Sequence, residues 1–382
     1  MESSSSHLLA ALALLAACLS PAHSQYLTQD DIPSDPADKA TVVGRWFVAP
    51  HDGFQGLKTI NPFLTDEDLR YTKRGDDCDD RKKSEVCAEL PSWFSGLGLS
   101  QPTAADGIRF IGITDGGPAN GCKEPDGTPD EVSHKDFVVP AFAPVVSEFR
   151  INLEAGALLL DNHCFLKGAD GAPLTGLPNT DRDDVPFSGG DCEDQLDRSI
   201  DGIDPEDVQK IPGTDLCLGG DEYSPSMFIF NCNFGSEDCG TVLTRYIPEG
   251  LELPGAAYEV RPILPGAFLN RRKGRGFESA AISPDGKAAI LLLQSAMGSD
   301  EDDSPFALSH TMHAVKLNIS DPADARVLGH FLYIGENVEN WFDSDEPKDT
   351  KLSSATWVSE FAGTDNDVLV VMERRKDQVT PL

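Results

Sequence analysis

The sequence predicts an all-β protein, specifically a β-propeller whose blades carry insertions in their loops. Three observations lead to this prediction. The 382 residues include 34 glycines and 27 prolines, which indicate many turns and few long helices. Apolar residues make up 40% of the chain, enough to build a sizeable core. A short unit recurs along the chain, as expected where each repeat forms one sheet around an axis.

The recurring unit is a glycine turn, an apolar strand and a polar residue where the strand ends. Its copies are "DGIRFIGITD", "PGTDLCLGGDE", "SPDGKAAILLLQ" and the looser "AGTDNDVLVVMER". The polar residues at the strand ends are Asp115, Asp221 with Glu222, Gln294 and Glu373. The copies lie farther apart than bare four-stranded blades require, which is why we expect insertions.

A second strand precedes each of these turns, so the unit is a hairpin. The inner strands of the four hairpins are expected to start near Gly98, Glu206, Glu278 and Ser354. A β-sandwich is the alternative fold, because it too is built from short strands and turns.

In a propeller, the strand ends of successive blades converge at one mouth of the central channel. The acids at these ends would then lie close together, although they are far apart in the sequence. Clustered carboxylates repel one another unless a cation lies among them or their pKa values rise. Oxygen ligands suit calcium or magnesium. The alternative is that each acid caps its own strand and faces solvent.

The first 24 residues have the features of a secretory signal. Leu8 to Leu19 form the apolar region, and Ala22 and Ser24 are the small residues expected before a cleavage site. A membrane anchor is the alternative, but the apolar run is too short to span a bilayer. We therefore expect a secreted protein with no membrane contact after removal of the signal. The net charge of −33 argues against nucleic acid as a partner.

Cysteine content agrees with export, since eight cysteines remain after the signal is removed. Cys78 with Cys87, and Cys232 with Cys239, are close in sequence and are predicted to close small loops. The sequence thus divides into the signal (1–24), an N-terminal disulfide-bearing segment (25–94) and a propeller domain (95–382). Asn318 lies in a glycosylation sequon, so the protein is expected to be a glycoprotein.

The segment 181–206 holds ten acids against two arginines. It lacks the spacing of an EF-hand calcium loop. We interpret it as a flexible, solvated insertion, with calcium binding as the alternative.

Several segments resemble those of the phytase-like family, whose domain is described as having esterase-like activity of phytase. They are "RFIGITDGGP", "LTGLPN", "DGIDPEDV", "GGDEYSPSMFIF", "YEVRPILP", "NRRKGRGFESAAISPDGK" and "VLVVMERRKD". They occur in order across residues 95–377. The resemblance implies a β-propeller and hydrolysis of phosphomonoesters.

On this resemblance, a calcium site is expected from five acids, which serve as metal ligands and catalytic groups: Asp115, Asp221, Glu222, Glu278 and Glu373. The calcium would bind the phosphate of the substrate. Arg275 and Arg374 are candidates for direct phosphate contacts, because guanidinium can bind phosphate oxygens in a bidentate manner. Further substrate contacts are expected from the basic run Arg271, Arg272 and Lys273. The alternative for this run is a solvated basic loop.

Two features depart from the family pattern. Relatives have Asp-Arg-Gly-Pro where this chain has Asp115-Gly116-Gly117-Pro118. Relatives also continue with further strands beyond the segment of Glu373. Either residues 25–94 complete the ring of blades, or the propeller is incomplete at its C-terminus.

The expected function is therefore secreted, calcium-dependent hydrolysis of a small anionic phosphoester such as phytate, by a monomer. Two alternatives stay open: a non-catalytic propeller stabilised by calcium, and a propeller lactonase or esterase. A thiol phosphatase is excluded, because the residues between Cys192 and Arg198 are acidic and would repel phosphate. The chain also lacks the Gly-x-Ser-x-Gly motif of a serine nucleophile.

Overall fold

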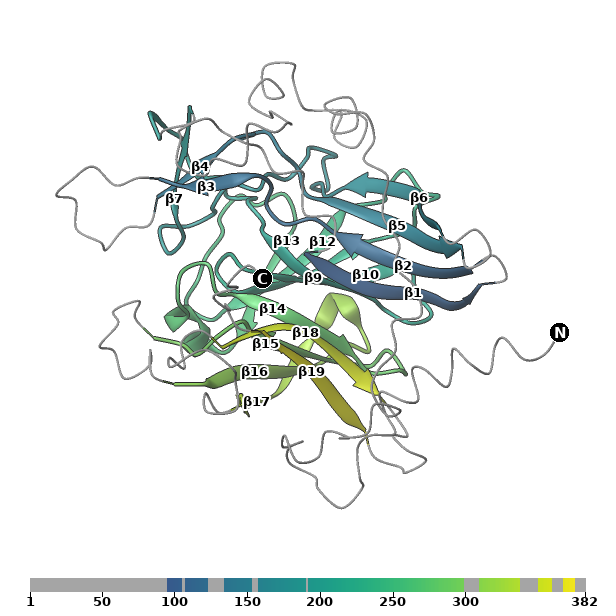
Figure 1. The fold of residues 1–382 in the computed structure, drawn as a ribbon. Helices are drawn as coiled ribbons and strands as arrows, with labels where there is room; N and C mark the ends of the chain where they lie inside the picture. The colour runs from purple at the N-terminus through teal and green to yellow at the C-terminus, as the bar shows by residue number, and fades with distance from the viewer. Residues whose placement is uncertain are drawn as a thin grey trace, which may run out of the picture.

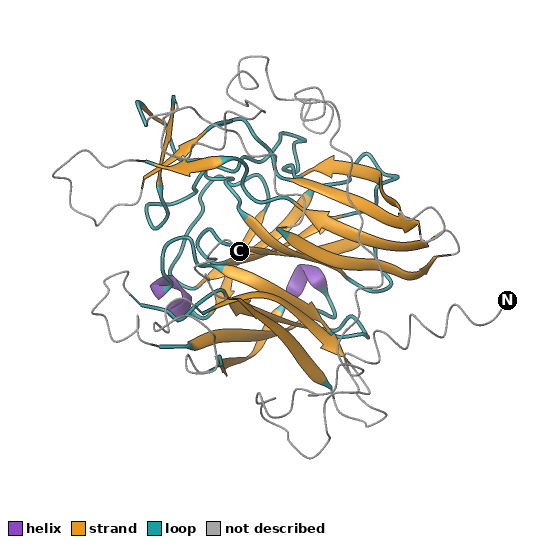
Figure 2. Cartoon of the chain, viewed as in Figure 1, coloured by secondary structure: helices purple, strands orange, loops and turns teal. Residues whose placement is uncertain are grey.

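The structure is a computed structural model, drawn in Figure 1. It describes residues 95–104, 107–122, 134–152, 157–189, 192–298, 309–336, 350–358 and 367–374. Within these ranges the chain forms strands and two short 3-10 helices, η4 (Gly266–Asn270) and η5 (Pro322–Asp324), as Figure 2 shows. The all-β prediction is confirmed. The predicted signal and the segment 25–94 lie outside the described residues.

The first sheet has the strand order β1-β2-β5-β6 and is antiparallel. Its strands are β1 (Gly96–Ala104), β2 (Gly107–Ile113), β5 (Val145–Asn152) and β6 (Ala157–Phe165). The second sheet has the order β13-β12-β11-β10-β9, in which β12 and β13 are parallel. Its strands are β9 (Pro205–Lys210), β10 (Leu216–Asp221), β11 (Ser226–Asn231), β12 (Val242–Pro248) and β13 (Glu259–Leu264).

The third sheet is antiparallel with the order β14-β15-β16-β17. Its strands are β14 (Phe277–Ile282), β15 (Ala288–Leu293), β16 (Thr311–Asn318) and β17 (Arg326–Ile334). The fourth sheet is an antiparallel pair, β18 (Lys351–Val358) and β19 (Val368–Arg374). Asn318 of the sequon is exposed at the end of β16, so a glycan there stays a prediction.

The first strand of each sheet packs along the first strand of the next. β1 contacts β9, β9 contacts β14, and β14 contacts β18. These strands contain the four positions expected to start the inner strands of the predicted hairpins, and each pairs with the strand that follows the glycine turn. The hairpin repeat is therefore confirmed, and the sheets follow one another around a common centre as in a propeller (Figure 1).

The four sheets do not close into a ring within the described part of the chain. β1 packs along β9, β9 along β14, and β14 along β18, but the described residues show no comparable packing of β18 along β1. The arrangement is thus a series of blade-like sheets without a described closing sheet.

Close packing of the inner strands depends on glycine. A Cβ atom on Gly96 would lie 2.4 Å from the Cα of Asp207, and one on Gly98 would lie 2.4 Å from the carbonyl oxygen of Val208. Side chains at these positions of β1 would force it away from β9. The "GLG" of the sequence therefore fixes the spacing of the first two sheets.

The inner strands of the third sheet are buried on both faces, between the second and the fourth sheet. On β14, Ala280 packs into the core shared with the second sheet, and Ala281 packs into the core shared with the fourth. On β15, Leu291 and Leu292 divide in the same way. Successive residues of a strand point to opposite faces, so a strand buried on both faces reads as a continuous apolar run. This explains the segment "AAILLL" of β15.

A small additional sheet has the strand order β3-β4-β7-β8. In the sequence, β3 and β4 lie between β2 and β5 of the first sheet, and β7 and β8 lie between the first and the second sheet. Its strands are β3 (Ala119–Gly121), β4 (His134–Phe137), β7 (Val185–Ser188) and β8 (Asp194–Gln195). A disulfide between Cys122 and Cys192 links the end of β3 to the segment before β8.

The cysteines predicted to close a small loop have other partners. Cys232 is bonded to Cys217 on the neighbouring strand β10, and Cys239 is bonded to Cys164 on β6. The predicted Cys232–Cys239 pair is therefore wrong, although both cysteines form disulfides. Strand pairing decided the partners, because β10 and β11 place Cys217 beside Cys232. Cys78 and Cys87 lie outside the described residues.

Candidate functional site

The polar residues of the repeat do stand at strand ends. Asp115 lies two residues beyond β2, Asp221 is the last residue of β10, and Gln294 directly follows β15. Glu373 is the penultimate residue of β19. Their side chains nevertheless have very different surroundings.

Three carboxylates form a compact group at the inner ends of β9 and β10. Asp204, Glu206 and Glu222 each offer an oxygen, and these oxygens all lie within 4.8 Å of one another. Asp204 and Glu222 are each 6% exposed, and Glu206 is partly buried. The backbone N–H of Glu222 donates to the carbonyl of Asp204 at 3.0 Å, which holds the two acids side by side.

Burial and mutual repulsion raise the pKa values of this acidic group. Burial, and then the charge of Asp204, raise the pKa of Glu222 to about 8, although Lys135 acts in the opposite direction. Burial also raises the pKa of Asp204 and takes that of Glu206 well above its usual range, with Glu278 adding to the latter. Glu222 therefore holds a proton near neutral pH unless a cation balances its charge. The group is therefore suited to hold a cation through oxygen ligands.

Asp115 shapes the turn that contacts this group. Its Oδ1 accepts a hydrogen bond from the N–H of Gly117 at 2.9 Å, and the N–H of Gly116 donates to Oδ1 of Asp204 at 2.6 Å. A Cβ atom on Gly176 would lie 1.6 Å from the carbonyl oxygen of Gly116. The Gly116-Gly117 pair is thus fitted to tight backbone packing.

Asp221 lies next to the acidic group but is bonded to an internal cation. Its carboxylate pairs with Arg245, accepts from the hydroxyl of Ser226, and accepts from the N–H groups of Asp204 and Tyr223 at 2.9 and 3.1 Å. Asp221 and Arg245 are both fully buried. Burial alone would lower the pKa of Arg245, but Asp221 and Tyr258 together outweigh burial and raise it. Asp221 therefore holds the backbone of Asp204 in place.

Glu278 stands on β14, beside the acidic group. One of its carboxylate oxygens pairs with Arg374 and the other accepts from the amide of Gln294. Glu278 is 5% exposed, and its charge contributes to the raised pKa values of Glu206 and Glu222. The structure thus brings Glu278, Gln294 and Arg374 together at the rim of the group.

Glu373 is directed elsewhere. Its carboxylate accepts from the hydroxyl of Tyr333 at 2.6 Å and from the N–H of Glu336 at 2.9 Å. Neighbouring residues of a strand point to opposite faces, so Arg374 reaches Glu278 while Glu373 points to the opposite face. The structure does not bring Glu373 together with the other acids.

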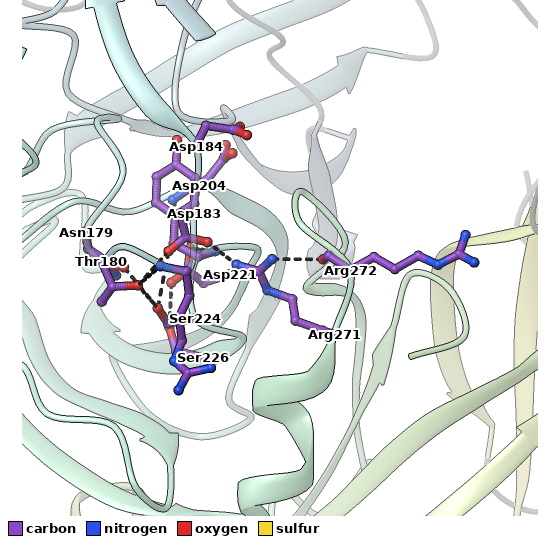
Figure 3. Close-up of polar contacts among 12 residues, drawn as sticks. Asn179, Thr180, Asp183, Asp184, Asp204, Asp221, Ser224, Ser226, Arg271 and Arg272 are labelled. Atoms are coloured by element: carbon purple, nitrogen blue, oxygen red, sulfur yellow. Dashed lines mark hydrogen bonds and ion pairs between the residues drawn. The ribbon is translucent and has the colours of Figure 1, made fainter. Parts of the chain in front are cut away.

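The basic loop before β14 contributes two buried arginines. Arg271 pairs with Asp183 and donates to the carbonyl of Arg272 at 2.8 Å, whereas Arg272 extends away from Asp183, as Figure 3 shows. Arg272 is only 7% exposed, yet its Nε and Nη2 have no hydrogen-bond partner among the described residues. Buried N–H groups without partners are costly, and an anion could satisfy these two.

Further cations surround Glu278. Burial, and then the charges of Arg275 and Arg374, lower the pKa of Lys351 at the start of β18. Lys273 of the same basic loop is partly buried. The site therefore has an acidic side on β9 and β10 and a basic side on the loop before β14, on β18 and on β19.

Sequence reasoning did not single out Asp204 or Lys351, and it treated Glu206 only as the start of a strand. A usable signal was present in "DGIDPEDV", where Asp204 and Glu206 stand two residues apart and so share one face of a strand. The interpretation of 181–206 as a flexible, solvated insertion is not supported. Asp183 and Asp204 are buried, because Arg271 and the N–H of Gly116 compensate them.

The protein is thus an all-β protein whose small sheets pack side by side through their first strands. Its candidate site lies where polar side chains meet at these strands. The family model "Phytase-like: Esterase-like activity of phytase" matches residues 140–381, more than half of the chain. The chain therefore belongs to the phytase-like family, which places it among hydrolases of the esterase type.

Two solved structures show weak similarity. A periplasmic gluconolactonase of Pseudomonas aeruginosa shares 11% identity over 73% of this chain and 64% of its own, less than two thirds of its length, with a TM-score of 0.31. A Bacteroides fragilis protein assigned as a 6-phosphogluconolactonase shares 14% identity over 74% of this chain and 84% of its own, with a TM-score of 0.22. TM-scores this low say nothing about the activity of this chain. No curated protein matches it.

Proposed function

We propose that the chain is an exported hydrolase that releases phosphate from phosphomonoesters, using calcium bound by Asp204, Glu206 and Glu222. The group of three carboxylates within 4.8 Å, at least two of them buried, carries this proposal. Carboxylate oxygens are ligands for calcium and magnesium, and burial together with mutual repulsion raises the pKa values of these acids, which a bound cation would oppose. The donor set therefore fits a hard divalent cation.

A divalent cation at this position would supply Lewis-acid polarisation of the phosphoryl oxygen of an ester. The protein itself would orient the substrate through the basic side of the site. Arg272, Arg275 and Arg374 can donate hydrogen bonds to phosphate oxygens, and the unpartnered N–H groups of Arg272 support that role. Lys273 and Lys351 add positive charge around them. Asp115 and Asp221 serve as positioning residues for Asp204.

The disulfides support export. Three of them form among the described residues, and such bonds are typical of oxidising compartments. Among the described residues, no helix is long and apolar enough to cross a membrane. Secretion through the predicted signal 1–24 and a monomeric state belong to the same proposal.

Hydrolysis of carboxylic esters or lactones is the second candidate, favoured by the esterase-like description of the family. The same acids could polarise a carbonyl through a bound cation. The two activities differ in their product, since only one releases phosphate.

The decisive experiment measures phosphate release from phytate and from an aryl phosphate, with calcium and then with chelator. We expect release that chelator abolishes and that Glu222→Gln reduces at least about tenfold, because one ligand is lost. Asp285→Asn, which changes an exposed acid of a β-turn, is the matched control. Ester hydrolysis without phosphate release would select the second candidate. Calcium stabilisation without either activity would indicate a non-catalytic calcium-stabilised protein.

A further inference from the structure

Arg272, in the loop before β14, presents one free edge of its guanidinium inside the protein. The residue is 7% exposed, and its Nε and Nη2 have no hydrogen-bond partner among the described residues. These two nitrogens lie on the same side of the planar guanidinium, so their N–H groups point in parallel. With this edge an arginine binds two oxygens of a phosphate or a carboxylate. The two unpartnered donors therefore form one bidentate contact for an oxyanion.

Arg271, the preceding residue, is used by the fold itself. Its Nη2 pairs with Asp183, and its Nη1 donates to the carbonyl oxygen of Arg272 at 2.8 Å. Figure 3 shows Arg271 between the two residues. Oδ2 of Asp183 also accepts from the hydroxyls of Thr180 and Ser224, at 3.1 and 3.3 Å. The acid is thus held by several bonds, and through Arg271 it fixes the backbone of Arg272.

The loop that carries Arg272 lies directly against Glu222 of the acidic group. A Cβ atom on Gly276 would lie 2.4 Å from the Cα of Glu222, and one on Gly274 would lie 3.7 Å from its Oε2. The carbonyl of Gly276 accepts from the N–H of Gln294 at 2.9 Å, which ties the loop to the end of β15. The loop of Arg272 is therefore part of the same site as the acids.

We infer that Arg272 binds a phosphate group without the help of a metal, and that the Asp183–Arg271 pair positions it for this contact. The inference rests on the proposed function only where it identifies this group as that of the substrate or product. The charge of the loop favours a phosphate dianion over a carboxylate. Its basic residues, all within positions 271–275, are Arg271, Arg272, Lys273 and Arg275.

The contact also predicts how the product acts on the enzyme. Hydrolysis of a phosphomonoester by water gives an alcohol and inorganic phosphate, which carries the same group as the substrate. Inorganic phosphate should therefore bind Arg272 after the alcohol has left and compete with the next substrate molecule.

The test titrates inorganic phosphate into the full chain in chelator, by calorimetry and by melting temperature, with acetate at equal ionic strength as the second probe. Arg272→Met removes the donors, and Arg272→Lys keeps the charge without the bidentate edge. Asp183→Asn keeps the size of the positioning acid and removes its charge. Arg326→Met, at an arginine whose side chain is 75% exposed, is the matched control.

We expect the wild type to bind phosphate in chelator and to melt at a higher temperature in phosphate than in acetate. Arg272→Met should bind phosphate at least about tenfold more weakly, because charge-assisted hydrogen bonds are lost. Arg272→Lys should lose most of the same affinity. Asp183→Asn should show an intermediate loss with Arg272 intact, and Arg326→Met should match the wild type.

No binding of phosphate by the wild type in chelator would overturn the inference, and so would equal affinities of the wild type and Arg272→Met. Acetate binding as tight as phosphate binding would overturn the assignment of the group. A folded Asp183→Asn with unchanged phosphate affinity would remove the positioning role. If this variant does not fold, Thr180→Val, which removes one hydrogen bond to Asp183, tests that role instead.

The outcome is separable from the proposed function. Phosphate binding that requires calcium would overturn the inference and leave calcium-dependent hydrolysis standing. Phosphate binding in chelator, without phosphate release from any ester in calcium, would keep the Arg272 site and remove the proposed function.

Discussion

Two sets of buried acids lie side by side in this protein, and they are compensated in different ways. Asp221 has its own buried arginine, Arg245, and accepts three further hydrogen bonds. Asp204 and Glu222 are buried to a similar degree, yet no arginine pairs with either within the described residues. The first arrangement is complete and structural. The second has no such arginine and is suited to hold a cation, so the contrast separates an acid compensated by the fold from a candidate binding site.

The largest expected effect comes from breaking the structural pair. Arg245→Met leaves Asp221 buried without a counter-ion, which should lower the free energy of unfolding by about 3–5 kcal/mol. Urea denaturation measures this loss. Arg326→Met, at an arginine whose side chain is 75% exposed, should cost less than about 1 kcal/mol and is the control. Equal losses in both variants would show that Asp221 is not held by Arg245.

The second prediction concerns the pH dependence of stability that buried acids such as Glu222 cause. The pKa of Glu222 is about 8 in the folded protein, against an ordinary glutamate value of 4.5, so the folded protein keeps a proton that the unfolded chain has lost. Stability in chelator should therefore fall as pH rises from about 4.5 to about 8. Asp207, whose pKa burial raises to about 7, acts in the same direction.

Melting temperatures across this pH range, with and without calcium, test the prediction. Calcium should flatten the decline, because a cation takes the place of the proton. Glu222→Gln should also flatten it in chelator, since the neutral amide cannot ionise. A decline that neither calcium nor Glu222→Gln alters would assign the pH dependence to other groups.

The same contrast shows how far sequence reasoning reaches. The hairpin repeat was predictable, because glycine turns and apolar runs are local features that fix β2, β10 and β15. The identity of the ligating acids was not. Asp221 and Glu222 are adjacent in the sequence and equally acidic, and only the distant Arg245 decides that Asp221 is structural.

Disulfide partners and counter-ions are likewise decided by residues that are distant in the sequence. Cys232 is closer in sequence to Cys239 than to Cys217, but strand pairing brings Cys217 beside it. Lys135 reaches Asp184 through the pairing of β4 with β7 in the small additional sheet, although the two residues are far apart in the sequence. Contacts between distant segments depend on tertiary packing, which short motifs do not encode.

A smaller effect is expected at the basic side. Arg272→Met should raise KM for phosphate esters about tenfold, since a charge-assisted hydrogen bond contributes roughly 1.5–3 kcal/mol. It should not lower stability, because the guanidinium that it removes is buried with unpartnered Nε and Nη2 atoms. Steady-state kinetics and melting temperature together test both statements, with Arg326→Met again as the control. A lower melting temperature with an unchanged KM would make Arg272 a structural residue.

The smallest effect is expected at Glu373, which the repeat placed among the metal ligands. Its carboxylate is bonded to Tyr333 and to the N–H of Glu336, on the face opposite Arg374. Glu373→Gln keeps the size of the side chain, so calcium affinity and KM should stay within about twofold of the wild type, as for a change remote from the site. Calorimetry of Glu373→Gln beside Glu222→Gln makes the comparison direct. A tenfold loss of affinity in the Glu373 variant would move the cation toward β19 and away from the acids on β9 and β10.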